Sequence, residues 1–174
     1  MDTLAHALWA GLGLVAAGRR VSIVPRIAAA AVGMAVLPDL AHLLPLLAGG
    51  GGLRTLIDYT FATPGAEPEL APWVAMLSHH LHCILHSAVI AGPVTLAAWR
   101  WRRAWMVPLA GWWSHIVIDV FTHSADFYPV PVLYPFTQRG FDGLAWNTPG
   151  FQLVNYGALA VAAIALLVTR RRPR

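Results

Sequence analysis

Residues 113–123 read Trp-Ser-His-Ile-Val-Ile-Asp-Val-Phe-Thr-His, an apolar run that contains three ionisable side chains. His115, Asp119 and His123 are four residues apart, so they form one stripe along an α-helix. A carboxylate inside a membrane-buried helix is costly unless it is paired or coordinated. The stretch therefore predicts an apolar helix that carries a functional polar site.

The composition of the whole chain indicates a membrane protein. Of its 174 residues, 57% are hydrophobic and 11% are charged, and the mean hydropathy is +0.59. Soluble domains typically carry about 25% charged residues, so a soluble globular domain and a disordered chain are both disfavoured. The single cysteine, Cys83, excludes a disulfide framework and a cysteine-rich zinc module.

Five apolar stretches predict an all-α, polytopic membrane helical bundle with about five transmembrane helices. They cover residues 3–18, 27–48, 72–99, 104–122 and 151–169. About 20 helical residues cross the hydrocarbon core, so the last four stretches are long enough and the first is marginal. We expect one integral membrane domain over residues 1–174, with longer loops at 49–71 and 124–150. The prolines of the second loop exclude a regular helix there.

The basic residues predict the orientation of this bundle. The net charge is +4, and all twelve basic residues are arginines. They cluster beside the apolar runs, at 19–26, 100–103 and 170–174, and only Arg54 and Arg139 fall on the other side of a five-helix chain. The positive-inside rule then places the N-terminus outside and the C-terminus inside. We expect a multi-pass protein of a bacterial-type cytoplasmic (inner) membrane, with no nucleic-acid partner.

Histidines and aspartates recur at helical spacing in other apolar stretches. Asp39 and His42 are three residues apart, and His79, His82 and His86 are three and four apart. His6 lies near the outer end of the first stretch. The predicted topology brings all of these residues to the outer half of the bundle. Imidazole and carboxylate groups together suit Zn²⁺, Fe²⁺ or Mn²⁺.

These residues predict a metal site. The candidate ligands are His6, Asp39, His42, His86, His115, Asp119 and His123, and we expect His82, Ser87 and Thr122 to support them by hydrogen bonds. A catalytic zinc usually takes three protein ligands, so the set suits one or two divalent ions, with zinc favoured over manganese and iron. Two other interpretations stay open. The polar groups could join the helices by hydrogen bonds, or His79, His82 and His86 could line a metal permeation path or ligate haem.

Taken in chain order, these motifs resemble the family of predicted membrane-bound metal-dependent hydrolases (YdjM-like). The motifs are Thr3/His6, Pro38-Asp39/His42, His86-Ser87 and Ser114-His115/Asp119/Thr122-His123. The chain departs from the family at Ala41, where many members carry a second acid. It also departs at residues 82–85, where the sequence His-Cys-Ile-Leu replaces a His-Arg-Gly lead-in. The family is distantly similar to zinc-dependent phospholipase C enzymes, which implies phosphoester chemistry.

The sequence therefore predicts a membrane-embedded metal-dependent hydrolase whose site opens to the extracytoplasmic side. The expected substrate is a phosphoester of a membrane lipid or a lipid-linked molecule. Asp39 or Asp119 is the expected catalytic proton acceptor, and Arg139 is a candidate phosphate contact. The alternatives are a divalent-metal transporter or channel and a haem-binding membrane protein. A transporter needs a polar path to the cytoplasmic side, and the inner halves of the apolar stretches offer almost none.

Overall fold

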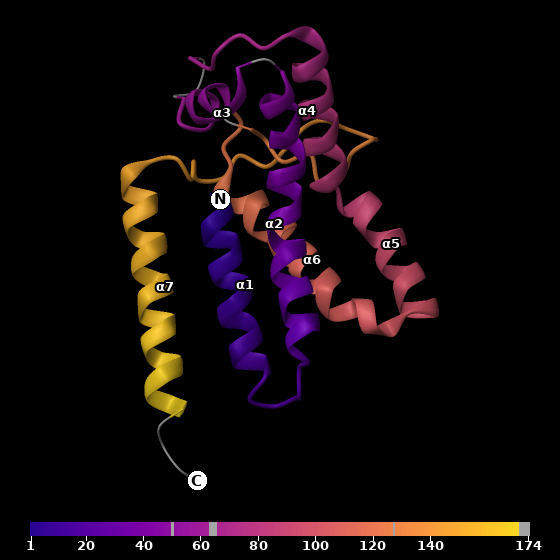
Figure 1. Ribbon diagram of the computed structural model, residues 1–174, viewed down its shortest axis with the longest axis vertical. Coiled ribbons are helices and arrows are strands. Elements are labelled where there is room, and N and C mark those ends of the chain that lie inside the picture. The colour runs from indigo at the N-terminus through magenta and orange to yellow at the C-terminus, as the bar shows by residue number, and fades with distance from the viewer. Residues whose placement is uncertain (50, 63–65, 127, 171–174) are drawn as a thin grey trace.

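The computed structural model describes residues 1–49, 51–62, 66–126 and 128–170 (Figure 1). Within these ranges the chain is all-α and has no strand, as predicted. The helices are α1 (Thr3–Ala17), α2 (Pro25–Ala48), α3 (Gly52–Thr60), α4 (Pro72–Leu85), α5 (Ala88–Trp101), the 3₁₀ turn η1 (Arg103–Trp105), α6 (Met106–Thr122) and α7 (Pro149–Arg170).

Helix lengths support a membrane protein. Among the described residues, α2 and α7 are long and apolar enough to cross a bilayer, and α4 with α5 makes a third span if the bent pair is counted as one. The helices α1 and α6 have 15 and 17 residues, at or below the lower end of the usual range for a span. The number of five spans and the orientation therefore stay predictions. Arginines 171, 172 and 174, which contribute to the predicted orientation, lie outside the described residues.

Two segments of the structure differ from the sequence-based predictions. The stretch 72–99 is not one continuous helix, because α4 and α5 meet at an angle of 54°. The Ser87 hydroxyl accepts a hydrogen bond from the backbone N–H of Ile90 and so caps α5. The expected loop 49–71 contains the short helix α3. Among its described residues, the segment between α6 and α7 has no helix until Pro149, as its prolines predicted.

Helix α2 is the centre of the bundle and packs against α1, α3, α4 and α6 (Figure 1). It approaches α6 closely at Gly111, where an added Cβ would lie 2.0 Å from the carbonyl oxygen of Ala31. Small residues let helix backbones touch in this way. On the other side of α1 stands α7, and the Trp9 indole donates a hydrogen bond to Asn155 Oδ1 across that contact, at 2.9 Å.

The irregular segment after α6 folds over the end of that helix. The backbone N–H groups of Gly143 and Leu144 donate to the carbonyl oxygens of His123 and Phe121. In Figure 1 this segment lies just above the N-terminus, below α3 and level with the lower half of α4. The start of α1, the second half of α2, the end of α4 and the end of α6 therefore meet beneath one covering segment.

Candidate metal centre

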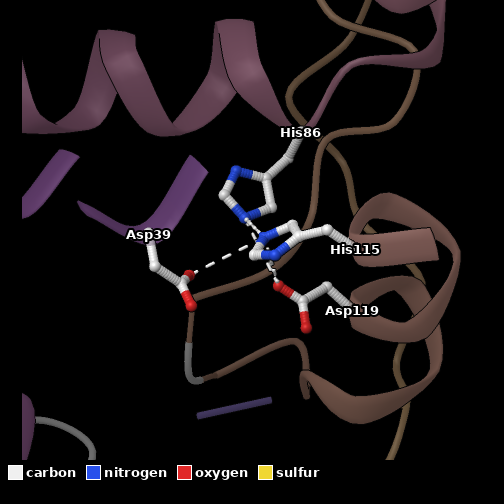
Figure 2. A group of neighbouring side chains, drawn as sticks. All are labelled: Asp39, His86, His115 and Asp119. Atoms are coloured by element: carbon white, nitrogen blue, oxygen red, sulfur yellow. Dashed lines mark hydrogen bonds and ion pairs between the residues drawn. The ribbon is translucent and has the colours of Figure 1, made fainter. Parts of the chain in front are cut away.

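Four buried side chains from three parts of the chain converge on one point (Figure 2). Asp39 comes from α2, His86 from the junction between α4 and α5, and His115 and Asp119 from α6. One nitrogen or oxygen atom from each of the four lies within 4.8 Å of the others. The arrangement therefore has the donor types and the spacing of a site that could hold a metal ion.

Backbone carbonyl groups orient the histidine rings. The Nδ1 atoms of His115, His86 and His123 lie 2.7, 2.8 and 2.7 Å from the carbonyl oxygens of Ala35, His82 and Tyr128. A carbonyl oxygen only accepts, so each Nδ1 carries a proton and donates it. In a neutral imidazole, Nε2 then has a free lone pair. Metal-binding histidines are commonly held by this kind of hydrogen bond.

The three Nε2 atoms surround one carboxylate oxygen of Asp119. Oδ2 of Asp119 lies 3.1 Å from Nε2 of His115, 3.3 Å from that of His86 and 3.4 Å from that of His123. This oxygen is fully buried and has no hydrogen-bond partner among the described residues.

These lone pairs and the Asp119 oxygen require positive charge between them. The Nε2 atoms of His115 and His86 are only 2.9 Å apart. Two nitrogen lone pairs and a carboxylate oxygen that face one another repel unless a cation or protons lie between them. Donor atoms about 3 Å apart are also what bonds of about 2.0–2.1 Å to a shared ion produce.

The other oxygen of Asp119 is held by neighbours of a different kind. Oδ1 lies 2.8 Å from Nε2 of His6, whose ring stacks on that of His115 with 3.9 Å between the centroids. The Thr122 hydroxyl and the Met1 backbone nitrogen also contact Oδ1. The Met1 nitrogen lies 3.0 Å from Nε2 of His123 as well. These contacts fix the Asp119 carboxylate and leave Oδ2 directed at the histidines.

Asp39 completes the group from α2. The Thr3 hydroxyl donates to Oδ2 of Asp39 at 2.9 Å, while Oδ1 lies 3.7 Å from Nε2 of His115. Motif reading placed Thr3 in the Thr3/His6 motif but not among the candidate site residues. It also missed the carbonyl groups that orient the rings, because a backbone acceptor leaves no signal in residue types.

His42 and His82 are buried beside the group. The rings of His82 and His86 have centroids 4.1 Å apart, and those of His42 and His82 are 5.4 Å apart. His79 is exposed, and its Nε2 lies 3.5 Å from the Cys83 sulfur. The predicted stripe of three histidines on one helix face is therefore divided, with His82 and His86 inside and His79 outside.

The Ser87 hydroxyl bonds to backbone groups rather than to a candidate ligand. It donates to the carbonyl oxygen of Tyr134 at 2.6 Å and accepts from the N–H of Ile90. Its observed role is to hold the junction that carries His86. The predicted supporting contact of Thr122 is present, since its hydroxyl lies 3.4 Å from Oδ1 of Asp119.

A small cavity of about 80 Å³ opens onto the group. It is lined by Met1, Asp2, Thr3, Asp39, His42, Leu43, Tyr59, Thr60, His123, Tyr128 and Trp146. A water molecule occupies about 30 Å³ in the liquid, so the cavity has room for a few waters or one small polar group. Burial, together with the nearby Glu67 carboxylate, raises the pKa of Tyr59, so its hydroxyl stays protonated at neutral pH. Arg139 is exposed and does not line this cavity.

No family model, curated protein or solved structure matches this chain. The resemblance to membrane-bound metal-dependent hydrolases therefore rests on the short motifs alone.

Proposed function

We propose that this chain is a membrane-embedded, metal-dependent hydrolase that acts on a phosphoester of a lipid or a lipid-linked substrate. The observation that carries the proposal is the arrangement of three histidine Nε2 atoms around the buried Oδ2 of Asp119, at 3.1–3.4 Å. Hydrogen bonding among neutral side chains does not satisfy this arrangement, whereas a divalent cation does.

Each residue of the group has a role in this proposal. His86, His115 and Asp119 bind the ion, for which zinc fits the nitrogen and oxygen donors best and manganese or iron also fit. A bound divalent ion would acidify a water and polarise the phosphoryl oxygen. Asp39 both adjoins the ligands and lines the cavity, so it is the carboxylate placed to accept a proton from that water. Thr3 holds Asp39 in position.

The surroundings of the cavity support a lipid substrate. Tyr59 and Thr60, which line the cavity, belong to α3. Leu53, Ile57 and Phe61 are exposed at four-residue spacing along α3 and its C-terminal cap. An amphipathic helix of this kind lies on a membrane surface. A lipid head group at the outer surface could therefore reach the cavity without leaving the membrane.

A second cavity, beneath the four-residue group, favours an enzyme over a transporter. It has a volume of about 630 Å³ and lies between α1, α2 and α6. Apart from the Trp9 indole, only Ser22 and Ser114 contribute polar side-chain groups to its lining. A hydrated divalent ion that moved past the histidines would find almost no ligand there.

Metal analysis of the purified protein tests the proposal. We expect about one or more zinc, manganese or iron ions per chain, and we expect Asp119→Asn to lose them. Asp58→Asn changes an exposed carboxylate on α3 and is the matched control, which should keep the metal. Metal-free native protein, or full metal content in Asp119→Asn, would contradict the proposed centre.

Activity separates the hydrolase from the transporter. Detergent-solubilised protein should hydrolyse phosphatidylglycerol in mixed micelles, and a chelator should abolish the reaction. Divalent-ion flux across sealed proteoliposomes, with no hydrolysis in micelles, would favour the transporter instead.

A further inference from the structure

Three buried histidines lie on the side of the metal centre that faces the irregular segment. They are His42 on α2, His82 on α4 and His123 at the end of α6, and each is at most 8% exposed. His42 and His123 line the 80 Å³ cavity, and His82 lines the neighbouring cavity of about 330 Å³. None of the three belongs to the four-residue group described above, although Nε2 of His123 lies 3.4 Å from Oδ2 of Asp119.

The ring nitrogens of two of them, His42 and His82, are poorly satisfied. The Nδ1 atoms of both His42 and His82 are buried and have no hydrogen-bond partner among the described residues. The nearest acceptor for Nε2 of His82 is the carbonyl oxygen of Pro129, at the long distance of 3.4 Å. Buried polar atoms almost always have a partner, so an unpartnered nitrogen on each of two rings whose centroids are 5.4 Å apart points to a ligand for both.

The charges of the cavity point to a cation. Asp39 and Asp119 together carry two negative charges, which one divalent ion would balance. No arginine or lysine is among the residues that line the 80 Å³ cavity. The Met1 nitrogen, which also lines the cavity, is already paired with Oδ1 of Asp119, so a phosphoester substrate would bring a further negative charge to a site with no unpaired cationic side chain in its lining. Sites that transfer or hydrolyse phosphoesters commonly meet this need with a second metal ion.

We infer that His42, His82 and His123 hold a second divalent cation next to the first. The rings of His42 and His82 are 5.4 Å apart and nearly perpendicular, at 81°. Rings that share an ion through bonds of about 2.0–2.1 Å have centroids roughly 5 Å apart. The rings of His82 and His123 are 6.5 Å apart, so binding requires His123 to move inward by about 1 Å.

Asp39 connects the two positions. Its Oδ1 lies 3.7 Å from Nε2 of His115 and 4.0 Å from Nε2 of His42, so one carboxylate oxygen lies near a ligand of the first ion and near the His42 ring. In this arrangement His82 is a metal ligand rather than a residue that only orients His86. The catalytic use of the second ion rests on the proposed function, but its binding is measured separately.

Zinc titration of chelator-treated protein, followed by equilibrium dialysis and metal analysis, tests this inference. We expect two ions per chain in the native protein and one in His82→Ala. His80→Ala, which changes an exposed histidine on the same helix, should keep two. The single ion that His82→Ala retains would also demonstrate that this variant folds. His82→Gln provides a second variant of similar size and should likewise bind one ion.

Loading with Mn²⁺ gives an independent spectroscopic measurement. Two manganese ions about 3.5–4 Å apart should give a spin-coupled paramagnetic resonance spectrum, which His82→Ala should convert to that of an isolated ion. One ion per chain in both native protein and His82→Ala would overturn the second position and leave the proposed hydrolase centre intact. Two ions in both would also overturn the assignment of His82, and no bound ion in the native protein would overturn both proposals.

Discussion

The two ends of the helix group α1, α2 and α6 differ in the polarity of their side chains. At one end, buried histidines and aspartates converge around a cavity of about 80 Å³. At the other end, toward the arginines that follow α1, the same helices enclose a cavity of about 630 Å³ with an almost wholly apolar lining. The buried groups that could bind metal are therefore confined to one end of the bundle. The backbones of α2 and α6 touch at Ala31 and Gly111, just beyond the polar end.

The polar end depends on where helices stop. His86 and His123 are the C-terminal capping residues of α4 and α6, so the chain turns away at both. This lets the irregular segment reach the site, where the carbonyl oxygen of Tyr128 orients His123. Asp39, His115 and Asp119 reach the site from within α2 and α6, whereas the ends of α4 and α6 add His86 and His123.

The largest effect should follow from removing a ligand at the polar end. His115→Ala should lose bound metal and lower hydrolysis by more than about 100-fold, since loss of even a residue that only orients a ligand costs 10–100-fold. His79→Ala removes an exposed histidine and should change neither quantity. Metal analysis and a lipid hydrolysis assay measure both. Unchanged metal content in His115→Ala would mean that the polar end is only a hydrogen-bonded contact between helices.

The boundary between the two ends should be the next most sensitive place. Gly111→Val puts a side chain where the Ala31 carbonyl lies, and overpacking of this kind costs about 1–3 kcal/mol. We expect a lower unfolding temperature in detergent and a reduced metal content, because α2 and α6 carry Asp39 and His115. Gly33→Val is the control, since a Cβ at Gly33 meets nothing within 4 Å. Equal unfolding temperatures for the two variants would contradict the close packing of α2 on α6.

A smaller effect should come from a residue that only positions a carboxylate. Thr3→Val removes the hydroxyl that holds Oδ2 of Asp39, and we expect about a 10-fold loss of hydrolysis with the metal retained. Thr169→Val changes a threonine near the arginine end and should leave hydrolysis unaltered. Equal hydrolytic activity of the two variants would contradict the role of Thr3 in positioning the Asp39 carboxylate.

The smallest effect should be at the apolar end. Ala110 lines the 630 Å³ cavity, so Ala110→Leu has room and should change stability by no more than about 0.5 kcal/mol. Metal content and hydrolysis should stay at the native level. A marked loss of metal in this variant would show that the two ends are coupled, against the separation described above.

The sequence predicted the polar end from residue types and helical spacing. The stripe of His115, Asp119 and His123 and the pair Asp39 and His42 do lie on faces that meet, because a polar group in an apolar helix has to find another polar group. The all-α fold followed from the apolar stretches in the same way.

Other features depend on contacts that no local pattern reveals. The break after Leu85 is held by the Ser87 cap and by a hydrogen bond to Tyr134, 47 residues away. The helix α3 is only nine residues long, too short for its pattern to stand out from a loop. The sequence predicts only a supporting role for His82, because its proximity to His42 appears only once α2 and α4 are packed together.

The most direct test of the metal centre is X-ray absorption at the edge of the metal bound to the purified protein. We predict nitrogen and oxygen ligands at about 2.0–2.1 Å from the metal, with the multiple-scattering signal of at least two imidazole rings, both lost in Asp119→Asn. A shell with sulfur from Cys83, a shell without imidazole, or a protein that holds no metal would contradict this prediction.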